Sequence, residues 1–163
     1  MRPVSNIFLF CLLASCLLLL SECHNPFSPV EDLDRIPETI TVNGVSISME
    51  TFLWRDFMPT IGAPPGSHLR AVITLTAEGT ASFPDYVGAD RLYVIYGEEV
   101  WETAFAEEIR PRDNAHLNQI QLVARGGPKW PVESLVHLIV RITIKGQGYR
   151  FIKALNQIIG ATY

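Results

Sequence analysis

The segment 135–145 constrains the fold of this chain more than any other. Apolar side chains occupy every second position within it, at Val136, Leu138, Val140, Ile142 and Ile144. This period of two is that of a β-strand with one buried face. Glycines at 146 and 148 interrupt the pattern, and residues 149–153 resume it. We therefore expect a central strand at 135–145 and a returning strand that forms a hairpin with it.

The register of this hairpin depends on its turn. If Gly146 and Gln147 form the turn, Tyr149 and Phe151 join the core face. A slip of one residue would bring Arg150 inside instead, because neighbouring residues of a strand point to opposite faces. The sequence leaves both registers open.

Turn signals separate several other strand-like segments. Residues 39–42 and 45–48 flank Asn43 and Gly44, a pair that favours the positive φ angles of a type I′ hairpin turn. By their alternation and aromatic content we predict further strands at 51–58, 69–77, 91–96, 100–105 and 116–124. A short helix is an alternative at 51–58, and 81–83 is at most one short strand.

Four individual side chains are predicted to be buried. Trp54 and Trp101 lie within strand patterns, so we expect both to face the core. The last segment, 155–163, is a strand or a helical turn with Ile158 and Ile159 as its buried pair.

Roughly eight or nine short strands with no long helix predict an all-β fold. The spacing of the turns favours an antiparallel β-sandwich of immunoglobulin-like arrangement over residues 39–163. A small closed barrel has similar strand statistics and is the alternative. The length of 163 residues suits one domain with its own core and is too short for two ordinary ones.

The charges of the chain argue against a nucleic-acid partner. The formal net charge is −4, and the 13 lysine and arginine residues are scattered, whereas nucleic-acid surfaces need clustered cations. The cysteines lie at 11, 16 and 23, so a disulfide framework is excluded from the rest of the chain. Burial of apolar side chains must stabilise the domain.

The amino-terminal segment has the layout of an export signal. Arg2 precedes an apolar run over residues 7–20. A helix of this length spans roughly 21 Å, less than the ~30 Å hydrocarbon core, so a permanent transmembrane anchor is disfavoured. Residues 24–38, which contain prolines and acidic residues without a sustained period, are predicted to be a linker.

The end of the apolar run, with Leu20, Ser21, Glu22 and Cys23, resembles the signal of bacterial lipoproteins. In that family a leucine and small residues precede a cysteine that is diacylated and becomes the new amino terminus. Glu22 stands where the family has a small residue. The resemblance implies a lipid anchor on Cys23, in the periplasm or at the outer surface of a bacterial envelope. Lipidation of Cys16, which fits locally but shortens the apolar run, and simple secretion are the alternatives.

The irregular loop 125–131 is the candidate binding site. Trp130 lies between two prolines, beside Arg125 and Lys129. A rigid, partly exposed ring could stack on a sugar or on a side chain of a partner, while the two cations complement an anionic group. The alternative is that Trp130 folds back as a lid over the edge of the core.

The sequence contains no recognisable catalytic or metal-binding motif. His68, His116 and His137 are isolated, and adjacent acids such as Glu98 and Glu99 point to opposite sides of a strand. We therefore expect no cofactor, no metal, and a non-catalytic binding or scaffolding role with a protein or glycan partner. The alternative is a small envelope enzyme that hydrolyses glycan or peptide. A pocket with two converging carboxylates or histidines would favour the enzyme, and a flat aromatic surface would favour binding.

Overall fold

The computed structural model describes residues 27–58, 66–111 and 116–163. The predicted export signal and the lipidation of Cys23 or Cys16 lie outside the described residues. Within the described ranges the chain is all-β, as predicted. A short helix, α2 (Pro29–Asp32), and a 3₁₀ turn, η2 (Leu33–Arg35), precede the strands, and no helix there is long and apolar enough to span a bilayer. The strands are β1 (Ile40–Val42), β2 (Val45–Asp56), β3 (Leu69–Glu78), β4 (Val87–Tyr96), β5 (Glu99–Thr103), β6 (Glu107–Ile109), β7 (Gln119–Gly127), β8 (Leu135–Ile144) and β9 (Gly148–Thr162).

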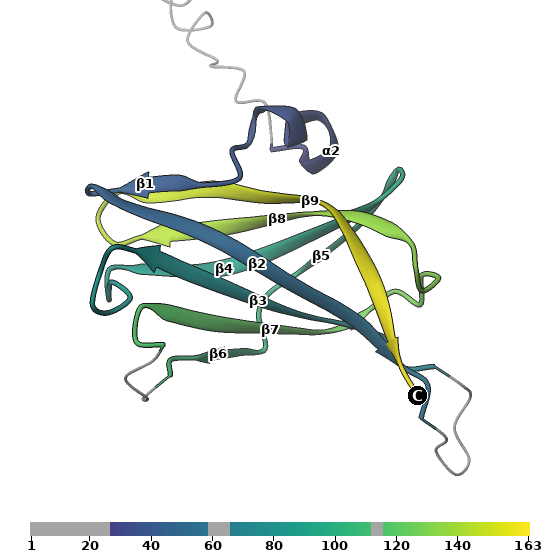
Figure 1. Ribbon diagram of the computed structural model, residues 1–163. Coiled ribbons are helices and arrows are strands. Elements are labelled where there is room, and N and C mark those ends of the chain that lie inside the picture. Colours follow the sequence, from purple (N-terminus) through teal and green to yellow (C-terminus); the bar gives the residue numbers. More distant parts are fainter. Residues whose placement is uncertain (1–26, 59–65, 112–115) are drawn as a thin grey trace, which may run out of the picture.

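The strands form one curled sheet rather than two separate layers (Figure 1). Their order is β5-β4-β8-β9-β2-β3-β7-β6, and β1 pairs with β2. β2 and β9 are parallel, and the other pairs are antiparallel. The sheet is therefore a mixed half-barrel, which differs from the expected antiparallel sandwich. The reason is β9, which pairs with β8 along most of its length and then with β2, joining two halves that a sandwich keeps apart.

The main core lies between two halves of the sheet, β5-β4-β8-β9 and β2-β3-β7-β6. β8 contributes every second residue of the predicted pattern, and none of the five is more than 3% exposed. β3 faces it with an equally regular set, Leu69, Ala71, Ile73, Leu75 and Ala77, all fully buried. The prediction of a central strand at 135–145 is confirmed, with the strand ending one residue earlier, at Ile144.

The first hairpin is confirmed and the last has the slipped register. Asn43 and Gly44 have φ angles of 49° and 82°, as a type I′ turn requires. In the β8–β9 hairpin Ile144 pairs with Gly148, so three residues form the turn and Arg150 pairs with Ile142. The Arg150 side chain stays exposed.

The register of the β8–β9 hairpin corrects the prediction for its aromatic residues. Tyr149 is 54% exposed and Phe151 is half-buried on the outer face, while Ile152 lies in the core. The guanidinium of Arg150 avoids the core by donating to the carbonyl of Thr41 at 2.7 Å. A charged side chain near the end of a strand thus reaches a polar partner at the surface.

Several strand predictions need adjustment. The strands predicted at 91–96, 100–105 and 116–124 have the bounds of β4, β5 and β7, and β6 was not predicted. The predicted strands at 45–48 and 51–58 are one continuous strand, β2. Residues 81–83 form a bend, with Phe83 buried in the core. The segment 155–163 is the end of β9 and contains no helical turn.

Part of the predicted linker is packed against the sheet. The Phe27 ring stacks on Phe151, with centroids 4.0 Å apart, and meets Tyr93 edge-on at 5.2 Å. Ile36, 7% exposed, joins Tyr93 and Ile95 of β4 and Ile139 of β8 on the outer face of the sheet. A helix of four residues is too short to show a hydrophobic period, which is why the sequence pattern indicated only a linker.

Candidate binding surface

The alternation along β2 turns two aromatic side chains outwards. Leu53 and Arg55 point to the core, at 2% and 7% exposure, whereas Phe52 is 60% exposed. Trp54 is half-buried on the same outer side, and its ring stacks on Phe52 with centroids 5.1 Å apart and planes at 30°. The prediction that Trp54 faces the core is wrong.

Arg55 can occupy the buried side because carbonyl groups satisfy its donors. Its Nε donates to the carbonyl of Ser67 at 3.0 Å, and its Nη1 donates to those of Lys129 at 3.2 Å and Trp130 at 2.9 Å. Gly66, at φ +85°, passes so close that a Cβ atom there would lie 2.7 Å from Nη2. These contacts hold the guanidinium of Arg55 on the buried side of β2. The alternate residues Phe52 and Trp54 therefore lie on the outer side of the strand.

Two aliphatic side chains extend the exposed surface across β9 and β8. Ile158 and Leu135 pair with each other and are 60% and 56% exposed. Because Leu53 pairs with Ile159 and both are buried, the preceding residues Phe52 and Ile158 lie on the outer side of adjacent strands. The prediction that both isoleucines are buried is thus wrong for Ile158. We call Phe52, Trp54, Leu135 and Ile158 the outer apolar face.

Polar groups border the outer apolar face. Val72 continues the apolar row onto β3, where it pairs with Phe52. Arg70 pairs with Trp54, and Glu50 is exposed one step before Phe52 on the same side of β2. An apolar centre with a polar rim is the usual anatomy of a protein interface, and contiguous exposed apolar patches on soluble domains commonly mark interaction sites.

The predicted site in loop 125–131 is dispersed. Trp130 is only 6% exposed; its indole N–H donates to Glu99 at 2.9 Å, and its ring lies 5.4 Å from that of Tyr96. Arg125 forms an ion pair with Glu107 at 2.8 Å, while Lys129 is exposed. The ring is therefore no exposed stacking surface, and the alternative of a lid over the core describes its position.

The sequence patterns did not point to the outer apolar face. Two signals were present in the sequence. In the run Phe52 to Asp56, the aromatic residues Phe52 and Trp54 alternate with Leu53 and Arg55. In the last segment, Ile158 and Ile159 are adjacent. Adjacent residues of a strand point to opposite faces of the sheet, so only one of the two can face the core. Applied to the isoleucine pair, this rule would have placed one of them outside.

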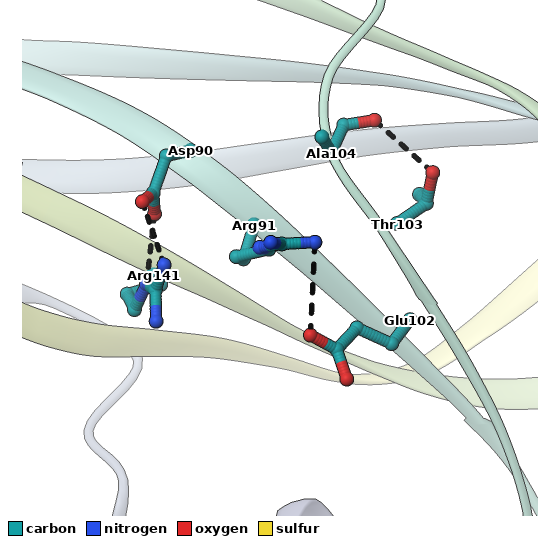
Figure 2. A network of polar contacts seen from close by, with 6 residues as sticks. All are labelled: Asp90, Arg91, Glu102, Thr103, Ala104 and Arg141. Atoms are coloured by element: carbon teal, nitrogen blue, oxygen red, sulfur yellow. Dashed lines mark hydrogen bonds and ion pairs between the residues drawn. The ribbon is translucent and has the colours of Figure 1, made fainter.

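A second polar cluster ties neighbouring strands together (Figure 2). Asp90 accepts from Arg141 Nε at 2.8 Å and from Nη2 at 2.7 Å, linking β4 to β8. Arg91 and Glu102 approach to 3.8 Å and link β4 to β5. The hydrogen bonds from Arg141 lower the pKa of Asp90 below its ordinary value, and those to Asp90 raise the pKa of Arg141. These pairs brace the sheet.

Three of the surface hollows in the described part of the chain bear on the enzyme alternative. A groove of about 540 Å³ lies between residues 35–41 and β9, and its lining contains no acid. The other two, of about 490 and 220 Å³, are lined by one carboxylate each, Glu38 and Asp85. None of the three is lined by a histidine, and no group of three or more potential metal ligands occurs among the described residues.

The fold and the surface define an all-β protein that presents one exposed apolar face. No family model, no curated protein and no solved structure matches the chain. The geometry of the outer apolar face is therefore the basis for a functional proposal.

Proposed function

We propose that this chain is a non-catalytic binding module of the bacterial cell envelope, held to a membrane by a lipid on Cys23. The outer apolar face is its contact surface for a protein partner. The observation that carries the proposal is that Phe52, Ile158 and Leu135, each more than half exposed, lie on one side of three adjacent strands. Covering apolar surface contributes about 25 cal/mol per Å², so a partner that covers these side chains gains free energy.

The composition of the face favours a protein over a glycan. Sugars stack on flat aromatic rings, but here Leu135 and Ile158 lie beside the aromatic pair, and the two rings are inclined by 30°. Mixed aliphatic and aromatic centres are typical of protein interfaces. Arg70, which forms no ion pair among the described residues, lies beside Trp54. We therefore expect a carboxylate at the rim of the partner surface.

The scaffold suits this role. The halves β5-β4-β8-β9 and β2-β3-β7-β6 enclose one core, as the layers of a sandwich do, and this likeness supports a sandwich-type domain of the kind that the sequence suggested. The shared strand β9 departs from the immunoglobulin-like arrangement. Side chains fixed on strands lose little conformational entropy on binding. The outer apolar face is therefore preorganised to bind a partner.

Photocrosslinking in intact cells tests the contact surface. A benzophenone-bearing phenylalanine analogue placed at Phe52 should give a discrete adduct with one partner. Tyr149 is the matched control, an exposed aromatic residue at the opposite end of β9 from Ile158, and the analogue there should give no such adduct. Equal adducts from both positions, or none from Phe52, would contradict the proposal. An adduct of twice the chain mass would show that the partner is a second copy of this chain.

Mass spectrometry of the amino-terminal peptide tests the anchor. We expect a diacylated peptide that begins at Cys23, because two acyl chains are needed for stable membrane attachment. An unmodified peptide that begins at His24 would show simple secretion, and a lipidated one that begins at Cys16 would show that the other cysteine is used.

A further inference from the structure

Phe27 fixes the place at which the chain leaves the folded domain towards its amino terminus. Its ring lies between those of Phe151 and Tyr93, over the outer face of β4 and β9. Only residues 24–26 separate it from Cys23. Since an extended chain spans at most about 3.6 Å per residue, the Cα atoms of Cys23 and Phe27 can be no more than ~14 Å apart.

Further contacts hold the segment that follows Phe27 on the sheet. Lys153 Nζ donates to the carbonyl of Leu33 at 3.0 Å, and the Lys153 backbone N–H donates to that of Pro37 at 3.0 Å. Ile36 is buried in the same outer cluster as Tyr93. The segment 27–37 is thus attached to the sheet at its beginning and at its end. The chain therefore leaves the domain towards residue 23 from one defined face.

We propose that the face formed by α2 and the outer side of β4, of residues 139–144 of β8 and of residues 148–153 of β9 lies against a phospholipid bilayer, with the outer apolar face outside this contact. This inference rests on the proposed lipid anchor at Cys23. A reach of ~14 Å exceeds the interfacial layer of one leaflet, roughly 5–8 Å thick, by about 6–9 Å, which is less than the width of the domain. The domain therefore cannot turn over freely on its anchor.

The arrangement of the elements supports this orientation. Figure 1 shows α2 above the sheet, β6 on the opposite side below it, and the C-terminal ends of β2 and β9 at the lower right. Phe52 and Trp54 lie in the C-terminal half of β2, and Ile158 lies in that of β9. A partner could approach these residues from the aqueous side while α2 stays at the bilayer.

The charges of this face indicate which lipid property matters. Glu31 and Asp34 are exposed, as is Arg35, and Asp32 is half-buried. These three acids and Asp90 are balanced by Arg35 and by three cations on the outer side of the strands, Arg91, Arg141 and Lys153. The face therefore has little net charge to attract anionic head groups, and tether length rather than electrostatics sets the orientation. Val30, an exposed apolar side chain of α2, is the residue that we expect nearest the lipids. The partner surface is thus a zwitterionic bilayer.

Depth-dependent quenching tests the orientation in the full chain, matured and acylated in cells and reconstituted into phosphatidylcholine vesicles. Beyond Cys23 the sequence contains no cysteine, so single-cysteine variants can be labelled with an environment-sensitive fluorophore. Val30→Cys is compared with Ile109→Cys on β6, because both native side chains are 44% exposed. Spin-labelled lipids should quench the label at position 30 at least threefold more than the label at position 109, and 0.5 M salt should not change that ratio.

Flotation of the vesicles separates the possible failures. A protein that does not float with them overturns the anchor and, with it, the orientation. Flotation with equal quenching at the two positions, or with stronger quenching at position 109, overturns the orientation alone. Loss of the difference in 0.5 M salt would show that charge, and not the tether, orients the domain.

Discussion

Replacing Arg55 with methionine tests whether the buried face of β2 is assigned correctly. The substitution keeps most of the side-chain volume but removes all guanidinium donors. The carbonyls of Ser67, Lys129 and Trp130 then lose their hydrogen bonds from this side chain. A buried acceptor left without a donor costs about 1–3 kcal/mol. One of the three hydrogen bonds is buried and two are part-buried, so the lower bound applies to each, and the loss in the free energy of unfolding is about 3 kcal/mol.

Urea unfolding followed by tryptophan fluorescence measures this loss, which corresponds to about 10 °C in melting temperature for a domain of this size. The matched control is Arg70→Met, on the outer side of β3, where the guanidinium forms no ion pair among the described residues. This control should change the free energy of unfolding by less than ~0.5 kcal/mol. The reasoning is refuted if Arg55→Met lies within ~0.5 kcal/mol of the parent, or if the two variants are equally destabilised.

Two further predictions follow from contacts in the structure. Trp130→Ala should lower the free energy of unfolding by about 3 kcal/mol, while Trp130→Phe, which loses chiefly the hydrogen bond to Glu99, should cost about 1 kcal/mol; equal urea midpoints for Trp130→Ala and the parent would return the ring to the surface. The lowered pKa of Asp90 means that its ion pair with Arg141 stabilises the fold above the ordinary aspartate range and that this contribution is lost as pH falls through the lowered pKa. Because both side chains are partly exposed, Asp90→Asn should cost at most about 1 kcal/mol at pH 7, and in urea titrations its difference from the parent should shrink as pH falls below the ordinary aspartate range.

The positions of most strands were predictable, because a period of two is a local property of the sequence. The segment 135–145 combines a regular apolar face with a turn signal on its far side, and both its place and its buried face were correct. The Asn43–Gly44 turn was predictable for the same reason: the two residues that the turn requires are adjacent in the chain.

The buried face of β2 was not predictable, because distant residues decide it. A charged residue normally faces solvent, which favoured Trp54 inside and Arg55 outside. The carbonyls that make the reverse arrangement stable belong to residues 67, 129 and 130. Two of the three come from a loop more than 70 residues away, and no local pattern reports their approach.

The sequence pattern did not show the burial of Trp130 for a related reason. Trp130 has the prolines and cations of an exposed binding loop around it. The acceptor for its indole N–H is Glu99, which lies 31 residues earlier. For Ile158, the positive φ of Asn156, 55°, accompanies an irregularity in the β8–β9 register. This shift changes which residues of β9 face the core, and the sequence alone does not show it.

The position of β9 in the sheet has a consequence for the order of folding. Thr51 and Gln157, 106 residues apart in the chain, form a hydrogen bond of 2.6 Å between β2 and β9. Contacts of such sequence separation form slowly, because the loop between them must close first. The two halves of the sheet are joined only when β9 pairs with β2, which precedes it by about a hundred residues in the chain. Until then β2 has β1 and β3 beside it but lacks its partner on the β9 side, and the core between the two halves stays open.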